Sequence, residues 1–109
     1  MKRKAFLFMM VMMTSAGMAV AVDATGLWNQ HCASCHGKDG TGNTTMGKKN
    51  GVKDYTDAKV QAAFSDGEAA KAIKEGVKEN GKDKMKPFGE KLSDADIKAL
   101  VAYIRSFKK

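Results

Sequence analysis

The chain holds few of the side chains that build metal sites. Its 109 residues include only two cysteines, two histidines and one proline. A structural zinc ion takes four ligands, mostly Cys and His, so every Cys and His in the chain would have to meet at one point. All four of these residues fall within residues 31–36, a segment too short to surround one ion easily. A zinc site is therefore disfavoured, and the two cysteines need another explanation.

The N-terminus has the pattern of a secretory signal peptide. Residues 2–4 are Lys-Arg-Lys, residues 5–22 carry no charge, and residues 19–21 give an A-x-A cleavage signal. We expect residues 1–21 to be a cleaved signal peptide and residues 22–109 to form one domain in the periplasm. A retained membrane anchor is the alternative, although Thr14, Ser15 and Gly17 dilute an apolar stretch that is already short for a span.

Cleavage makes methionine scarce as well. Six of the eight methionines leave with the signal peptide, so only Met46 and Met85 remain, and the net charge falls from +7 to +4. A domain as small as residues 22–109 makes a marginal hydrophobic core without help. A large apolar cofactor would supply what is missing.

The most specific signal is the run Cys32-Ala33-Ser34-Cys35-His36. On one helical turn Cys32, Cys35 and His36 stand at i, i+3 and i+4, so their side chains share a face. A C-x-x-C-H run in an exported protein predicts the attachment of one c-type haem. The two thiols would bond covalently to the haem vinyl groups, and His36 would bind the iron as proximal ligand.

Three other uses of the cysteine pair stay open at this point. The pair could be a redox-active dithiol, a structural disulfide or half of a zinc site. A dithiol oxidoreductase usually places the pair after a strand, and nothing before Cys32 has a strand pattern. Haem attachment is the interpretation that the spacing favours.

The apolar periodicity predicts helices and no strands. Helices are expected over residues 23–35, 57–64, 68–77 and 93–107, the last one capped by Ser93, with Trp28 as a core aromatic. Three glycines in the loop after His36 require positive φ angles. Residues 44–55 are expected to be irregular, and residues 80–84 to form a turn before an extended loop at residues 85–89.

This order resembles the class I c-type cytochromes over essentially all of residues 22–109. The resemblance rests on an amphipathic helix running into C-x-x-C-H-G, a methionine loop, and a closing helix with Leu92-Ser93-Asp94-Ala95-Asp96-Ile97. It implies an all-α fold in which the N- and C-terminal helices cross and short helices and loops wrap around one covalent haem. By position, the helix crossing would use Ala24 or Gly26, together with Trp28 and Tyr103.

Two departures from the family bear on the axial ligands. A proline carbonyl commonly orients the proximal histidine, but residues 44–55 contain no proline, and Lys86 separates Met85 from Pro87. The resemblance still implies that Met85 is the second axial ligand, because it precedes the last helix and lies 49 residues beyond His36. Met46, ten residues after His36, is the competitor. Methionine sulfur raises the reduction potential of haem iron.

Filled axial positions imply electron transfer rather than catalysis. An enzyme or a gas sensor needs an open position, usually beside polar groups, and residues 22–109 offer only His31 and Arg105 as a spare histidine and arginine. The resemblance therefore implies a monomeric periplasmic carrier, not an enzyme, that shuttles single electrons between larger redox proteins. The alternative is a haem enzyme or a gas or redox sensor in which the Met85 bond breaks.

Lysines suggest how the redox partners would be recognised. Six of them fall in the loops expected to border the haem: Lys38, Lys48, Lys49, Lys82, Lys84 and Lys86. Such a border would steer the chain toward acidic docking patches on its partners. The plainer interpretation is that these are solvated surface lysines. No nucleic acid partner and no stable membrane insertion after cleavage are expected.

Overall fold

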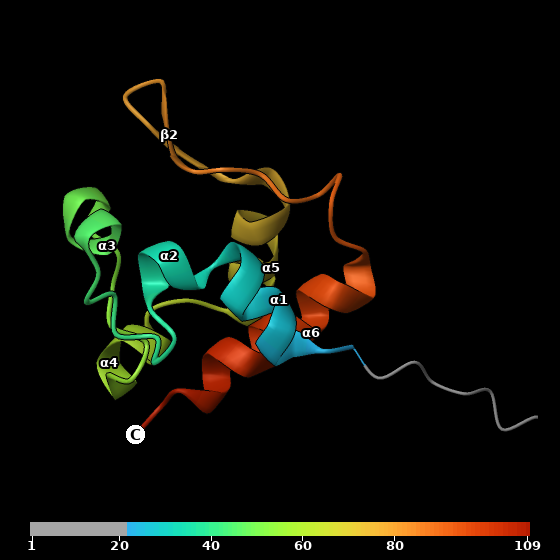
Figure 1. The fold of residues 1–109 in the computed structure, drawn as a ribbon, viewed down its shortest axis with the longest axis horizontal. Coiled ribbons are helices and arrows are strands. Elements are labelled where there is room, and N and C mark those ends of the chain that lie inside the picture. The colour runs from blue at the N-terminus through green and yellow to red at the C-terminus, as the bar shows by residue number, and fades with distance from the viewer. Residues whose placement is uncertain (1–21) are drawn as a thin grey trace, which may run out of the picture.

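The computed structural model describes residues 22–109, and the predicted signal peptide lies outside this range (Figure 1). The described chain is mostly helical, as predicted, and adds one small antiparallel hairpin that was not predicted. The elements in chain order are α1 (Ala24–His31), α2 (Ala33–His36), α3 (Thr45–Asn50), α4 (Ala58–Ala62), α5 (Asp66–Glu75), β1 (Val77–Glu79), β2 (Lys82–Met85) and α6 (Asp94–Ser106).

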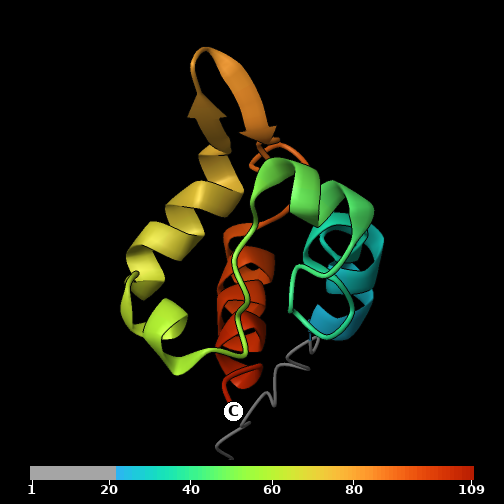
Figure 2. The ribbon, with the colours of Figure 1, turned by 90° about the vertical axis from the view of Figure 1, so that its left-hand side faces the viewer.

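Helix α6 is the central element, with α5 on one side and α1 to α3 on the other (Figure 2). It begins where the sequence predicts. The Ser93 hydroxyl accepts from the Asp96 N–H at 3.1 Å, and the Asp96 carboxylate accepts from the Ser93 N–H at 3.0 Å. This capping box satisfies two N–H groups that the first turn leaves free. The predicted apolar face is buried, at Ile97, Leu100, Val101 and Ile104.

The first and last helices pack together through aromatic side chains. Trp28 is 1% exposed, and its ring centroid lies 5.7 Å from that of Tyr103 and 5.1 Å from that of Phe107. The predicted contact of Trp28 with Tyr103 is confirmed. A Cβ at Gly26 would first meet the Asp23 carboxylate, which caps α1, rather than α6.

The helix predicted over residues 23–35 is interrupted. Cys32 has a φ of −116°, away from regular helix values, so α1 ends at His31 and α2 starts at Ala33. The Cys32 N–H still donates to the Trp28 carbonyl at 2.8 Å. The attachment motif therefore begins at a joint between two helices.

The predicted irregular segment at residues 44–55 contains a helix, α3. Thr44 caps it by accepting from the Gly47 N–H at 2.8 Å, and Gly51, in the left-handed region with a φ of +64°, ends it. Residues 44–51 include two glycines and one asparagine and have no apolar periodicity. The sequence pattern therefore does not predict this helix.

Helices α4 and α5 are displaced from their predicted bounds. The carboxylate of Asp57 caps α4 (Ala58–Ala62). Residues 65–67 were expected to be a break, but Ser65 and Glu68 form a capping box that starts α5 at Asp66. Gly76, with a φ of +75°, ends α5 before Val77, which instead begins β1.

The turn predicted at residues 80–84 is the end of a hairpin. Asn80 and Gly81 both have positive φ, 53° and 77°, as a two-residue hairpin turn requires. Strands β1 and β2 pair antiparallel, with Val77 opposite Met85. Figure 2 shows the hairpin projecting beyond the helices, so Met85 lies at its base.

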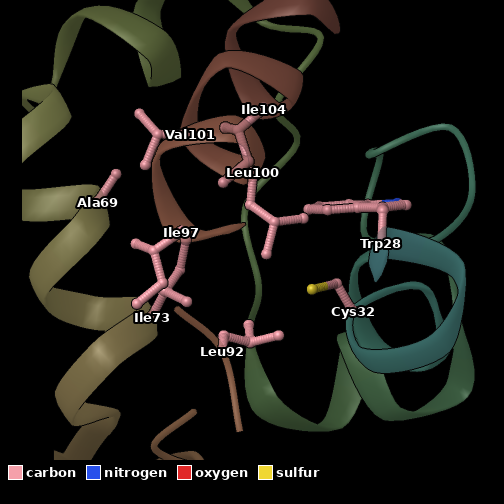
Figure 3. Close-up of a cluster of buried hydrophobic side chains, with 9 residues drawn as sticks. All are labelled: Trp28, Cys32, Ala69, Ile73, Leu92, Ile97, Leu100, Val101 and Ile104. Atoms are coloured by element: carbon pink, nitrogen blue, oxygen red, sulfur yellow. The ribbon is translucent and has the colours of Figure 1, made fainter. Parts of the chain in front are cut away.

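The buried hydrophobic side chains gather between α1, α5 and α6 (Figure 3). They are Trp28, Cys32, Ala69, Ile73, Leu92, Ile97, Leu100, Val101 and Ile104. Trp28 is a core aromatic, as predicted. The sulfur of Cys32 points from the joint between α1 and α2 toward these side chains, so the first cysteine of the motif belongs to the core itself.

Candidate functional site

A cavity of about 260 Å³ opens between α1, α5 and α6. It is lined by Trp28, Cys32, His36, Tyr55, Phe64, Glu68, Ala69, Ala72, Ile73, Met85, Leu100 and Ile104. Three of the four predicted site residues, Cys32, His36 and Met85, therefore meet at one mostly apolar cavity although 53 positions separate the first from the last. Cys35 is half-buried on α2 and does not line the cavity. Met46, the competing methionine, is 45% exposed on α3 and does not line it either.

Cys32 lacks the lowered pKa of a redox-active thiol. Burial, with a smaller contribution from the neighbouring Cys35, raises the pKa of Cys32 to about 11. Redox-active cysteines need the opposite shift, because the thiolate is the nucleophile. Within residues 22–109 the two cysteines are not joined to each other, and no strand precedes them. These observations disfavour the dithiol and disulfide interpretations.

The zinc interpretation also finds no support in the described part of the chain. Within residues 22–109, no three His, Cys, Asp or Glu side chains cluster closely enough to hold a metal ion. Among the described residues that line the cavity, only Cys32, His36 and Met85 carry a sulfur or an imidazole nitrogen that could bind a metal ion.

The imidazole of His36 is packed between aromatic rings. Its centroid lies 5.3 Å from that of Tyr55, with the two planes stacked at 19°, and 5.5 Å from that of Trp28. Burial lowers the pKa of His36 and so favours the neutral form, which is the form that binds metals. Nδ1 of His36 is buried and has no hydrogen-bond partner among the described residues. The carbonyl acceptor that the sequence could not name is not seen here.

The backbone of the motif is held at three carbonyl groups. Nε1 of Trp28 donates to the Gly37 carbonyl at 2.9 Å, the Thr44 hydroxyl donates to the Cys35 carbonyl at 2.6 Å, and the Gly42 N–H donates to the His36 carbonyl at 2.7 Å. The loop that supplies the last two contacts turns through Gly37, Gly40 and Gly42, which have the predicted positive φ. The loop therefore folds back on the motif and fixes it.

Met85 reaches the cavity from the last position of β2. Gly76 allows this approach, because a Cβ there would lie 2.5 Å from the Met85 carbonyl oxygen and 2.8 Å from the Pro87 nitrogen. Beyond Met85, the N–H groups of Phe88 and Gly89 donate to carbonyls of α5 at 2.9 and 3.0 Å. The segment from Met85 to Gly89 thus packs against Gly76 at the end of α5 and is hydrogen-bonded to the last turn of that helix.

His31, the spare histidine, is the last residue of α1. It is half-buried, with its ring edge-on to Phe88 and the centroids 5.4 Å apart. The last residue of α1 therefore contacts the segment that follows Met85. His31 does not line the cavity.

The comparisons with known proteins show the family of the chain. Residues 21–108 match the family model described as cytochrome c. The chain belongs to the cytochrome c family. It is 33% identical over 82 residues to cytochrome c-554(547) of Halothiobacillus neapolitanus, covering 75% of this chain and 90% of that protein.

Two solved structures are similar in fold as well as sequence. One is the KustC0563 c-type cytochrome, at 42% identity and a TM-score of 0.73, covering 81% of this chain and all of that one. The other is a tyrosine-to-phenylalanine variant of a cytochrome of the same name, at 41% identity and a TM-score of 0.70, covering 80% of this chain and all of that one.

As a member of the cytochrome c family, the chain is a haem-binding electron-transfer protein whose iron-containing haem c is attached covalently. The cavity suits that group. Its walls are mainly aliphatic and aromatic. A buried thiol could attach the haem covalently, and a neutral imidazole and a thioether could bind the iron. Among residues 22–109, no helix is long and apolar enough to cross a membrane.

Proposed function

We propose that this cytochrome is a periplasmic carrier of single electrons with His36 and Met85 as the axial ligands of its iron. Cys32 and Cys35 would hold the haem through thioether bonds. The observation that carries the proposal is the meeting of Cys32, His36 and Met85, from α1–α2 and β2, at one apolar cavity. When bound, the haem supplies the one-electron couple, and the protein sets its potential through the ligands and the surrounding packing.

The polar side chains near the cavity favour transfer over catalysis. Arg105 is engaged by Asp66 and by the Phe64 and Gln61 carbonyls, and it does not line the cavity. The one charged residue in the cavity wall, Glu68, accepts from the Ser65 N–H as part of a helix cap. No free acid or base is therefore positioned to act on a bound molecule in the described cavity. The alternative, an enzyme or sensor, requires Met85 to dissociate.

One face of the molecule suits docking of a redox partner. Thr44 and Gly47 of the α3 segment pack directly on the Cys35 carbonyl. The exposed residues of the segments that meet here include Met46, Lys48 and Lys49 on α3 and Lys38 just after α2, which we name the basic α3 face. None of these lysines forms an ion pair among the described residues. Lys84, by contrast, is paired with Glu79 at 2.9 Å.

The basic α3 face can be tested with charged small oxidants. The ferrous holoprotein is mixed with anionic ferricyanide or cationic tris(phenanthroline)cobalt(III), and the rate is measured against ionic strength. The ferricyanide rate should fall as salt rises, because the Debye length shrinks from about 30 Å at 0.01 M to about 10 Å at 0.1 M, and the cobalt rate should rise.

The matched variants reverse two charges each. Lys48→Glu with Lys49→Glu should slow ferricyanide about tenfold at low salt and speed the cobalt complex. Lys91→Glu with Lys98→Glu, on the α6 side, should change both rates much less. Equal effects of the two pairs would show that the α3 face does not guide the electron-transfer partner.

A further inference from the structure

Three residues outside the attachment motif form a continuous connection from α6 to His36. Gln61 is the only polar side chain buried in the described core, at 4% exposure. Its Nε2 donates to the Tyr55 carbonyl at 2.7 Å and to the Ile104 carbonyl at 2.8 Å. Its Oε1 accepts from Nη1 of Arg105 at 2.9 Å. All of its side-chain hydrogen-bonding groups are thus used, which suits a fixed position.

Arg105 fixes the other end of this connection. Its Nη1 also donates to the Gln61 carbonyl, and its Nη2 donates to the Phe64 carbonyl at 2.8 Å. Its Nε donates to the Asp66 carboxylate at 2.8 Å, and the guanidinium lies 4.4 Å over the Phe64 ring. A planar fork with this many partners holds one geometry, which a lysine would not reproduce. We call Gln61 and Arg105 the Gln–Arg clamp.

The clamp holds Tyr55, and Tyr55 holds His36. The Tyr55 backbone is bound on both sides, since its N–H donates to the Gly40 carbonyl at 2.9 Å and its carbonyl accepts from Gln61. Its ring rests edge-on against Phe64, with the centroids 5.9 Å apart, and forms an offset stack on His36, with the centroids 5.3 Å apart. The clamp and the contacts of Tyr55 therefore link α6 to the imidazole of His36.

His36 depends on this packing because it lacks the usual hydrogen bond. A metal-binding histidine normally donates its second ring N–H to an acceptor that fixes the ring plane. Nδ1 of His36 is buried without such a partner among the described residues. The rings of Tyr55 and Trp28 are the neighbours that restrict its rotation.

We propose that Gln61 and Arg105 are positioning residues for the haem iron, which set the plane of His36 through the stacked ring of Tyr55. The inference rests on the proposed role of His36 as axial ligand. The plane of an axial imidazole determines how its π orbitals meet those of ferric iron, and this orientation sets the g values of the low-spin electron paramagnetic resonance (EPR) spectrum.

The test is the EPR spectrum of ferric holoprotein variants, recorded beside their thermal unfolding curves. Gln61→Met removes both donors at similar length, and Tyr55→Leu removes the ring. Both should shift or broaden the largest g value while the iron stays low-spin. Tyr55→Phe, the conservative variant, should keep the wild-type EPR line at the largest g value, because the stack on His36 needs only the ring. Gln30→Met, the same change at an exposed position on α1, is the matched control.

A wild-type line in folded Gln61→Met and Tyr55→Leu would overturn the inference, whatever their melting temperatures. If Gln61→Met fails to fold, Tyr55→Leu and Arg105→Lys decide the matter by the same line. A high-spin spectrum in the wild-type protein would instead contradict the proposed His36 and Met85 ligation. The two failures are therefore distinguishable.

Discussion

At the scale of single residues, burial in the cavity changes the pKa values of two predicted site residues. Burial raises the pKa of Cys32 to about 11 and lowers the pKa of His36. Before the haem is attached, both shifts favour the uncharged form of the side chain. Both are consequences of an apolar cavity, which disfavours charged forms. The same cavity makes a neutral thioether such as Met85 a suitable neighbour for haem iron.

The two remaining methionines give a direct comparison at this scale. Met85→Ala should abolish the far-red absorption band of methionine-bound ferric iron and lower the reduction potential, because a neutral sulfur ligand favours ferrous iron. It should also speed the binding of carbon monoxide to the reduced protein. Met46→Ala, at an exposed position, should change none of these properties. The opposite pattern would transfer the ligand role to Met46.

Which site residues could be predicted depended on how local their signal is. Cys32, Cys35 and His36 lie within five positions, so their spacing alone predicts the chemistry, and Met85 is implied by its place before the last helix. Tyr55, Gln61 and Arg105 gave no such signal. Gln61 and Arg105 are 44 positions apart, and only the packing of α4 against α6 brings them together.

At the scale of elements, helices and turns with a local capping or turn pattern could be predicted from the sequence, and the others could not. Ser93 before an amphipathic run predicted α6 correctly, because a capping box is a local pattern. Helix α3 has few apolar residues and is held by contacts with the distant Cys35 carbonyl, so periodicity could not reveal it. The Asn80-Gly81 turn was recognised, but β1 and β2 are exposed and lack the alternation that marks a strand.

The junction between α5 and the hairpin provides a test at this scale. Gly76→Ala places a methyl group against the Met85 carbonyl in a left-handed backbone. It should destabilise the holoprotein by about 1–3 kcal/mol and weaken the far-red band, since Met85 must move. Chemical denaturation and the ferric spectrum measure the two effects.

Gly81→Ala is the control for backbone strain alone. Gly81 has a similar φ of +77°, but an added Cβ would meet no atom within 4 Å. This variant should cost about 1 kcal/mol and leave the spectrum unchanged. A far-red band of unchanged intensity in Gly76→Ala would show that the junction does not position Met85.

At the scale of the whole molecule, the core is built around the cofactor cavity. Residues from α1, α5 and α6 both form the hydrophobic core and line the cavity, among them Trp28, Ile73, Leu100 and Ile104. A domain this small has little other apolar mass to bury. Folding and haem attachment should therefore be coupled, as metal binding and folding are in other small domains.

This coupling predicts the state of a chain that cannot attach haem. Cys32→Ala with Cys35→Ala should give a protease-sensitive protein with little fixed tertiary structure. Near-ultraviolet circular dichroism during heating provides the measurement. A sharp cooperative transition in the double variant, like that of the holoprotein, would show that residues 22–109 form a stable core without the cofactor.

The central claim is that His36 and Met85 fill both axial positions of the iron in a carrier of electrons. The ultraviolet–visible spectrum of the purified ferric protein tests it most directly. A low-spin spectrum with the far-red band of methionine ligation is the predicted result. A high-spin spectrum without that band would mean an open iron position, and it would contradict the account in favour of an enzyme or a sensor.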